Sequence, residues 1–263
     1  MDLKLLNKVA LVGGSSKGIG KGCAVQLAKE GAHVVLCARN LKSLSETADH
    51  IRSFSRSEVL SVAGDLSKKE DIKHMVETTV NKFNRIDILV VNSGGPKPGN
   101  FFELDEKDWH EAYQSVLFYV VELYKHVIPL MITNKWGRII NITSLAVKEP
   151  NENLILSNVF RTGVVSMAKT ISKQLIASNI TINNICPGAF KTDRATQLIL
   201  NKALKEGITA EEVEKNMIQG FPGKRFNTID EIGNLVSFLS SDLAQGITGT
   251  TLQIDGGISS SLF

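Results

Sequence analysis

The sequence is poor in the features that mark several classes of protein. Of its 263 residues only three are cysteine, six are proline and three are tyrosine, and the formal net charge is only +3 at pH 7. Basic residues form no long block, which argues against a nucleic-acid-binding protein. The opening segment lacks an unbroken apolar run of the signal-peptide type, and no segment has the apolar length expected of a membrane span. We therefore expect a cytoplasmic protein with neither nucleic acid nor a membrane as partner.

The cysteines also exclude a disulfide framework. Cys23, Cys37 and Cys186 are odd in number, far apart and set among apolar residues. Buried free thiols in a reducing compartment fit this pattern better than a disulfide or a metal site. We expect no metal.

What the sequence does contain is a regular alternation of short apolar runs and amphipathic runs. Strands that alternate with crossover helices predict an α/β fold, a doubly wound parallel sheet of about seven strands with helices on both faces. No repeat or low-complexity linker appears, so residues 1–263 are expected to form a single domain. The expected strands are 9–12, 33–38, 59–63, 86–91, 138–142, 181–186 and 251–255. The expected helices are 22–29, 41–54, 68–83, 106–132, 154–177 and 229–239, with a weakly packed helical segment at 192–221.

The first strand leads into a glycine-rich turn and then a helix. Gly14, Gly18 and Gly20 follow the strand directly. Such glycines bring bare backbone and the positive end of a helix close to a ligand, which suits a pyrophosphate. A tight turn without a ligand is the alternative. Ser16 and Ile19 lie within this turn and are candidate cofactor residues.

The end of the second strand indicates which dinucleotide is bound. An acidic residue usually holds a free ribose 2′-hydroxyl here, but this chain has Ala38 and Arg39, followed by Asn40. Lys17 adds a second cation from the glycine turn. Two cations at the adenosine end suit a 2′-phosphate, so we expect NADP, with NAD less favoured. Solvated surface charge is the alternative.

Further candidates follow the other strands, because ligands of doubly wound sheets bind beyond the carboxyl ends of the strands. Asp65 can accept the adenine amino group or cap the next helix, where Ser67 is the better cap. Asn92 is expected to tie its turn to neighbouring strands. The remaining candidates for cofactor binding are Leu66, Ser93, Gly94, Pro187, Gly188 and Thr192.

Together these motifs resemble those of the short-chain dehydrogenase/reductase family over essentially the full chain. The resemblance rests on the glycine turn, Asp65, Asn92-Ser93-Gly94-Gly95, Ser144, Pro187-Gly188 with Thr192, Ile247-Thr248-Gly249 and Asp255-Gly256-Gly257. Within this family, the chain resembles the 3-oxoacyl-[acyl-carrier-protein] reductases and the sugar dehydrogenases. The resemblance implies a Rossmann fold, an NAD(P) cofactor, a small carbonyl or alcohol substrate and, usually, a homotetramer. Roughly residues 192–225 are then the substrate-loop helices.

The pattern of the family breaks at its catalytic relay of asparagine, serine, tyrosine and lysine. By the family's spacing Ser144 keeps the serine, while Val116, Ser157 and Arg161 occupy the asparagine, tyrosine and lysine positions. None of the three tyrosines is followed by lysine four residues later. Ser157 and Arg161 are spaced to share a helical face. A serine is a far weaker acid than a tyrosine, and an arginine cannot shuttle a proton.

Three functions remain open from the sequence. The first is an NADP(H)-dependent oxidoreductase with an unusual site of Ser144, Ser157 and Arg161, in which Arg161 also holds the cofactor ribose. The second is a dinucleotide-binding or regulatory protein that has lost catalysis, and the third is a lyase or isomerase. Arg161 with Lys148, Lys191 and Arg194 hints at an anionic substrate, although surface charge is the simpler interpretation of the last three.

The two helices expected at 106–132 and 154–177 carry more apolar residues than one buried face needs. We expect them to mediate self-association as a homotetramer, with a dimer as the alternative. The apolar residues in question are Val116, Leu117, Val120, Val121, Leu123, Val164, Val165 and Met167.

Overall fold

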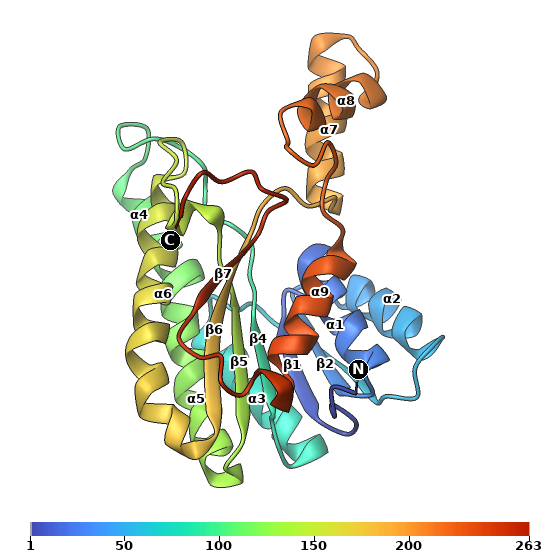
Figure 1. Cartoon of the computed structure of the whole chain (residues 1–263), viewed down its shortest axis with the longest axis vertical. Helices are drawn as coiled ribbons and strands as arrows, with labels where there is room; N and C mark the ends of the chain where they lie inside the picture. The colour runs from blue at the N-terminus through green and yellow to red at the C-terminus, as the bar shows by residue number, and fades with distance from the viewer. Residues whose placement is uncertain (1, 263) are drawn as a thin grey trace.

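The computed structural model describes residues 2–262 and contains the predicted parallel sheet. Its seven strands run in the order β3-β2-β1-β4-β5-β6-β7 (Figure 1). The strands are β1 Val9–Gly13, β2 His33–Ala38, β3 Val59–Ala63, β4 Ile88–Val91, β5 Gly137–Ile142, β6 Ile180–Pro187 and β7 Thr251–Ile254. The predicted ranges differ from these only at their ends.

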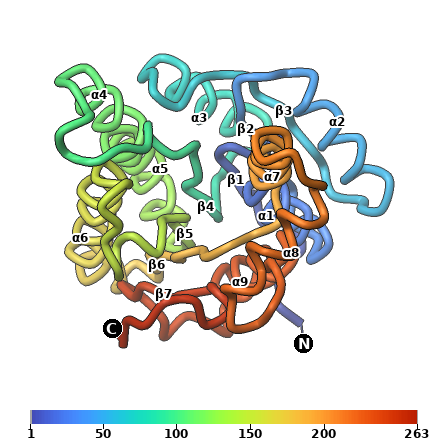
Figure 2. The backbone as a smooth tube through the Cα atoms, turned by 90° about the horizontal axis from the view of Figure 1, so that it is seen from above, coloured from blue at the N-terminus to red at the C-terminus, as the bar shows by residue number. Residues whose placement is uncertain are grey.

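Helices cover both faces of the sheet (Figure 2). One apolar layer joins the sheet to α1 Gly18–Lys29, α2 Leu41–Arg52 and α9 Ile229–Leu239. The other joins it to α3 Lys69–Phe83, α5 Tyr119–Asn134 and α6 Ile155–Leu175. Side chains of a strand alternate between the two layers, so both faces of each inner strand are buried, which explains why the strands are apolar throughout. Cys23, Cys37 and Cys186 are buried free thiols, as predicted.

The long helix predicted over 106–132 is interrupted. It consists of α4 Glu106–Ala112, a π-helical segment η1 Tyr113–Phe118, and α5. The Ser93 hydroxyl, from the loop after β4, donates to the carbonyl of Ser115 within η1 at 3.1 Å. A π-helical turn takes up extra residues without changing the apolar pattern much, so periodicity did not reveal it.

This helical stretch also corrects two expectations. Within residues 2–262, Glu106–Asn134 is long and apolar enough, by length and composition alone, to cross a membrane, contrary to the expectation that no segment is. A core helix meets the same criteria, and Val120 and Leu123 lie in the core under the sheet. Val116, Val120, Leu123 and Val164 are therefore buried within the subunit and are not left over for self-association.

Between β6 and α9 the chain leaves the body of the molecule. The helices α7 Asp193–Glu206 and α8 Ala210–Gln219 project from it as an arm (Figure 1). The arm has its own small apolar cluster, which contains Ile199, Ala203, Val213 and Phe226. Short helical turns complete the fold: η2 Leu145–Val147, η3 Ile176–Ser178 and η4 Asp242–Ala244.

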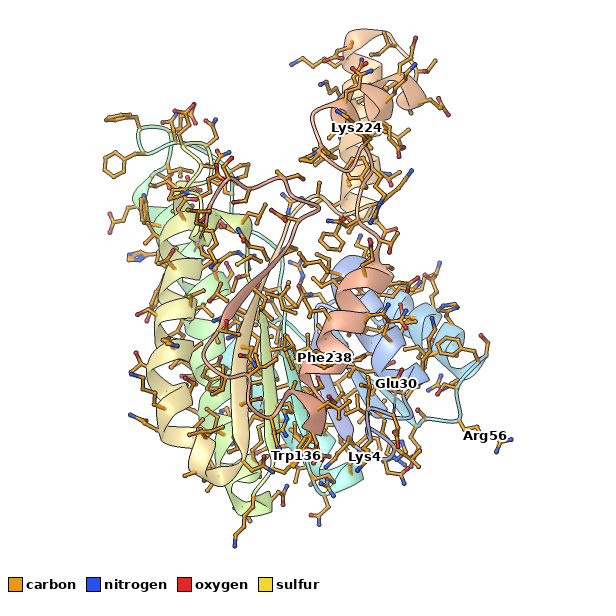
Figure 3. All side chains as sticks on the ribbon, in the orientation of Figure 1. Lys4, Glu30, Arg56, Trp136, Lys224 and Phe238 are labelled. Carbon is orange, nitrogen blue, oxygen red and sulfur yellow. The ribbon has the colours of Figure 1, made fainter. Side chains whose placement is uncertain are left out.

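A buried arginine organises the end of the sheet opposite the arm. Figure 3 shows Trp136 at this end. The Arg138 guanidinium is fully buried and donates to Asp242 Oδ1 and to the carbonyls of Gly137 and Asn179, each at 2.9 Å. Trp136 Nε1 donates to the same Asp242 oxygen at 2.9 Å, and its ring packs against the guanidinium. Asp242 therefore neutralises the charge of Arg138 and orients the tryptophan.

We expect Asp242→Ala to destabilise the protein by about 1–3 kcal/mol, because it leaves a buried guanidinium without its carboxylate. The midpoint of urea unfolding measures the effect. Asp49→Ala is the matched control, since Asp49 pairs with Arg52 on the exposed surface and such pairs contribute little. Equal midpoints for the two variants would contradict the role assigned to Asp242.

Candidate functional site

At the turn between β1 and α1, the first N–H groups of α1 have no side-chain partner within residues 2–262. Gly14 and Gly18 adopt φ values of 58° and 60°, which favour glycine. A Cβ on Gly20 would collide with the carbonyl of Gly14, so the turn is also tightly packed. Lys17 is the N-cap of α1 but makes no capping bond, whereas the Asn40 side chain caps α2. Free donors at the positive end of α1 fit a phosphate group.

Asn92 joins this turn to the end of β4. Its Nδ2 donates to the carbonyl of Gly13 at 3.0 Å and to that of Gly14 at 3.5 Å, so the predicted tie between neighbouring strands is confirmed. Because β1 lies between β2 and β4, the connections after β1 and β4 leave the sheet in opposite directions. This switch point is where doubly wound sheets bind ligands.

At the carboxyl end of β2, Lys17 and Arg39 are exposed and form no ion pair with the rest of residues 2–262. Asp65 lies nearby at the end of β3. Burial raises the pKa of its carboxyl, but hydrogen bonds from Ser67 and the charge of Arg39 outweigh burial and lower the pKa overall. Asp65 is therefore ionised at neutral pH and offsets part of the charge of Arg39.

Two polar residues at this end serve neighbouring turns. Asn40 Oδ1 accepts from an N–H in the first turn of α2 at 2.9 Å. Ser67 donates its N–H and its hydroxyl to Asp65 Oδ1 at 3.0 and 2.8 Å. Lys68, not Ser67, is the N-cap of α3 and makes no capping bond. The predicted capping role of Ser67 is wrong, because α3 begins one residue too late for it and its hydroxyl is turned toward Asp65.

The other expected cofactor residues lie at the same edge of the sheet. Gly94 is exposed, and a Cβ there would meet nothing within 4 Å. Gly188 packs closely against Asp255, because a Cβ added to Gly188 would lie 2.6 Å from the Cα of Asp255. The half-buried members of this set are Ser16, Ile19, Leu66, Ser93, Pro187 and Gly188.

The structure brings two of the expected catalytic residues, Ser144 and Arg161, to the carboxyl end of β5. The Ser144 hydroxyl accepts from the N–H of Ala146 at 3.1 Å and so starts η2. Arg161 extends from α6 and donates through Nη1 to the carbonyl of Ile142 at 2.9 Å. Ser157 lies one turn earlier on the same buried face of α6, as predicted, and forms no side-chain hydrogen bond with the described residues 2–262.

Among the described residues 2–262, Arg161 is a buried charge without a carboxylate beside it. Its side chain belongs to a residue only 8% exposed. Burial lowers the pKa of its guanidinium, Tyr119 and Cys186 oppose that shift, and Arg194 adds to it. Tyr119 and Cys186 are neutral at neutral pH, because burial raises the pKa of both groups. The charge of Arg161 is thus balanced only by dipoles.

Sequence reasoning missed Tyr119 and Cys186 as neighbours of the site. The spacing of four residues between a tyrosine and a lysine, which Tyr119 does not satisfy, says nothing of contacts between helices. Cys186 immediately precedes the Pro187-Gly188 motif, and that position was a usable signal. Its Sγ lies 3.3 Å from the Thr143 hydroxyl. Across residues 2–262, no three His, Cys, Asp or Glu side chains form a group suited to a metal ion.

Thr192 connects the arm to the glycine turn. Its hydroxyl accepts from the N–H of Ala195 at 3.3 Å and caps α7. Its side chain lies 3.7 Å from the position that a Cβ on Gly18 would occupy. The start of α7 therefore lies over the turn where a pyrophosphate fits.

The cations expected near the pocket mouth separate into two kinds. Lys191 pairs with Glu214 of α8 at 2.6 Å, which agrees with surface charge, the simpler interpretation of this residue. Arg194 and Lys148 form no ion pair within the described residues. Arg194 Nη1 lies 3.4 Å from the position of a Cβ on Gly95, in the loop after β4.

Comparisons with known proteins agree with this geometry. A family model described as Enoyl-(Acyl carrier protein) reductase matches residues 14–259. The 3-oxoacyl-[acyl-carrier-protein] reductase FabG of Staphylococcus epidermidis is 30% identical over 253 residues, which cover 96% of this chain and 99% of that protein. The NADPH-dependent reductase BacG of Bacillus subtilis is 32% identical over 251 residues, covering 95% and 97%.

Solved structures extend the agreement to three dimensions. L-Sorbose reductase from Gluconobacter frateurii, complexed with NADPH and L-sorbose, has a TM-score of 0.96 and 30% identity, and all of each chain is covered. The sequence motifs, the strand order and these full-length similarities lead to one conclusion. The chain belongs to the short-chain dehydrogenase/reductase family.

Proposed function

We propose that this protein is an NADP(H)-dependent oxidoreductase that interconverts a small carbonyl compound and its alcohol in the cytoplasm. The observation that carries the proposal is the uncapped start of α1, closed by Asn92 at the switch point, with Ser144 and Arg161 at the end of the neighbouring strand β5. The first position suits a dinucleotide phosphate, and the second lies where a reacting carbonyl would meet hydrogen-bond donors. NADPH-dependent reductases among the relatives support this assignment.

The residues present fit NADP better than NAD. The acidic side chain that would hold a free 2′-hydroxyl is absent, since Ala38 ends β2. Lys17 and Arg39 are exposed and form no ion pair among residues 2–262. Asp65 is available to the adenine, and the Thr192 hydroxyl to the nicotinamide carboxamide. The glycine turn would hold the pyrophosphate.

At the reacting end the chain supplies hydrogen-bond donors and charge. NADPH supplies the hydride when it is bound. The Ser144 and Ser157 hydroxyls can donate to a carbonyl oxygen, and the Arg161 guanidinium stabilises negative charge that develops on that oxygen. Arg161 stays protonated and Ser157 is a weak acid, so neither replaces a tyrosine as general acid. Water or the substrate itself then supplies the proton.

A second candidate function follows from the same residues. Losing a positioned general acid costs on the order of 10²–10⁴-fold in rate. A chain with Val116, Ser157 and Arg161 at the relay positions can therefore bind the dinucleotide as a regulatory or binding protein with little turnover. Consumption of NADPH by the purified protein, measured against aldehydes, oxo acids and sugars, separates the two candidates. Turnover of any of these substrates supports the oxidoreductase, and its absence with intact NADPH binding supports the alternative.

The cofactor proposal predicts the effect of removing the two cations. Lys17→Gln combined with Arg39→Gln should weaken NADPH binding by about 10- to 100-fold, because two charge-assisted contacts to the 2′-phosphate are lost. NADH binding should hardly change. Fluorescence titration measures both affinities. Lys29→Gln, at the far end of α1, is the control, and an equal loss for NADH and NADPH would refute the proposed role.

The proposal for the catalytic site predicts a gain of activity. Ser157→Tyr with Arg161→Lys restores an acidic phenol and a neighbouring cation that lowers its pKa. We expect the double variant to reduce diacetyl about 10²-fold faster than the natural chain. Thermal unfolding and NADPH titration check that the larger side chain is tolerated. If the double change instead abolishes a brisk natural activity, Ser157 and Arg161 are themselves the working site.

We also propose a homotetramer, with a dimer as the alternative. Its support is the apolar surface that remains exposed beside α4 and α6, which includes Phe101, Phe102, Tyr113 and Val159. Exposed apolar patches of this kind mark association surfaces. Light scattering at micromolar concentration should give the mass of four 28.7 kDa chains. A monomer mass would exclude both forms.

A further inference from the structure

At the reacting end of the site, two arginines form no ion pair with any carboxylate of residues 2–262. Arg161 lies at the end of β5, on α6, and Arg194 lies in the first turn of α7. The inference drawn from this pair rests on the proposed function, because it concerns the substrate of the same site. Each arginine approaches from a different element, and each has unused hydrogen-bond donors.

Arg161 has more donors than the described part of the chain satisfies. A guanidinium carries five N–H groups in a planar fork. In residues 2–262 its side chain makes one hydrogen bond, from Nη1 to the Ile142 carbonyl at 2.9 Å. The residue is only 8% exposed, so water satisfies the remaining donors poorly. Its charged neighbours include no Asp or Glu side chain.

Arg194 lies in α7, close enough to Arg161 for its charge to act on that guanidinium. Thr192, two residues earlier, packs on Gly18 of the glycine turn, and Arg194 Nη1 lies 3.4 Å from the position of a Cβ on Gly95. The guanidinium therefore lies against the loop after β4, next to the strand that leads to Ser144. The charge of Arg194 acts on Arg161 and helps to lower the pKa of the Arg161 guanidinium.

Two other cations of this region are neutralised within residues 2–262, whereas Lys148 shares the lack of an ion pair with Arg194. Lys97 pairs with Asp108 at 2.8 Å and Lys191 with Glu214 at 2.6 Å. Within the described residues Arg194 has no ion pair. An uncompensated pair of guanidinium groups, one of them buried, is stabilised by an anion with two oxygens in a plane, which is the geometry of a carboxylate.

We propose that Arg161 and Arg194 together bind the carboxylate of the substrate, so that the protein acts on oxo acids or hydroxy acids in preference to neutral carbonyl compounds. Arg161 supplies the buried, fixed part of the site. Arg194 supplies the part of the site that belongs to the arm, since it lies in α7. The diphosphate of the dinucleotide offers the same anionic oxygen chemistry, and the experiment below distinguishes the two.

The test compares Arg194→Gln with Lys191→Gln, a control three residues away whose charge is already paired. The substrates are 2-oxohexanoate and its methyl ester, with NADPH as reductant. We expect Arg194→Gln to lower kcat/KM for the acid by about 10- to 100-fold, and to change the ester by less than about threefold. Lys191→Gln should leave both values nearly unchanged.

Two binding measurements make every outcome informative. Calorimetry of 2-oxohexanoate with the NADP⁺-loaded protein needs no turnover, and we expect binding that Arg194→Gln weakens and Lys191→Gln does not. Fluorescence titration gives the NADPH affinity of each variant. An Arg194→Gln loss that is equal for acid and ester overturns the proposal, as does an equal loss of NADPH affinity, which assigns the arginine to the diphosphate. Acid binding without any reduction would keep the carboxylate site and reject the proposed oxidoreductase instead.

Discussion

The hydrogen bonds from the Asn92 amide to Gly13 and Gly14 hold together the part of the fold on which the site depends. They join the end of β4 to the turn after β1, across the line where the strand order reverses. The turn is also tied to β2 and α2, because the Cys37 N–H donates to Ser15 Oγ and the Thr47 hydroxyl donates to the carbonyl of Ser16. Together these bonds position the N–H groups at the start of α1 relative to the loop that leads to η1. The part of the site that suits a dinucleotide phosphate depends on them.

The fold follows from the sequence because its two strongest signals agree. Each inner strand is buried on both faces, so it appears as an unbroken apolar run, and each helix shows a helical period with a polar side. The π-helical segment at Tyr113–Phe118 did not follow from the sequence, because the apolar pattern does not show it and its contact with Ser93 joins residues 22 positions apart. Ser67 does not cap α3, because its hydroxyl donates to Asp65 and the helix begins one residue later than the capping pattern requires.

The sequence predicted the parts of the site that depend on spacing along the chain. It did not predict the parts that depend on which side chains pair in the folded protein. The positions of Ser144, Ser157 and Arg161 follow from their distances along the chain, and the structure places two of them at the end of β5. No feature of the sequence separates Lys191 from Arg194, yet one is paired with Glu214 and the other is not. Such pairing depends on how α7 and α8 fold against each other. Tyr119 was missed for the same reason, since its relation to Arg161 spans two helices.

The energetics of Arg161 bear on whether the altered site is a working one. A buried guanidinium costs several kcal/mol of desolvation, and a single carbonyl partner does not recover that cost. An apolar side chain of similar volume would stabilise α6 against the sheet more than Arg161 does. The arginine therefore does not serve the stability of the subunit. A site that only filled space after losing its tyrosine would have no use for a buried charge, whereas a site that must hold an anionic group or a developing negative charge needs one already in place.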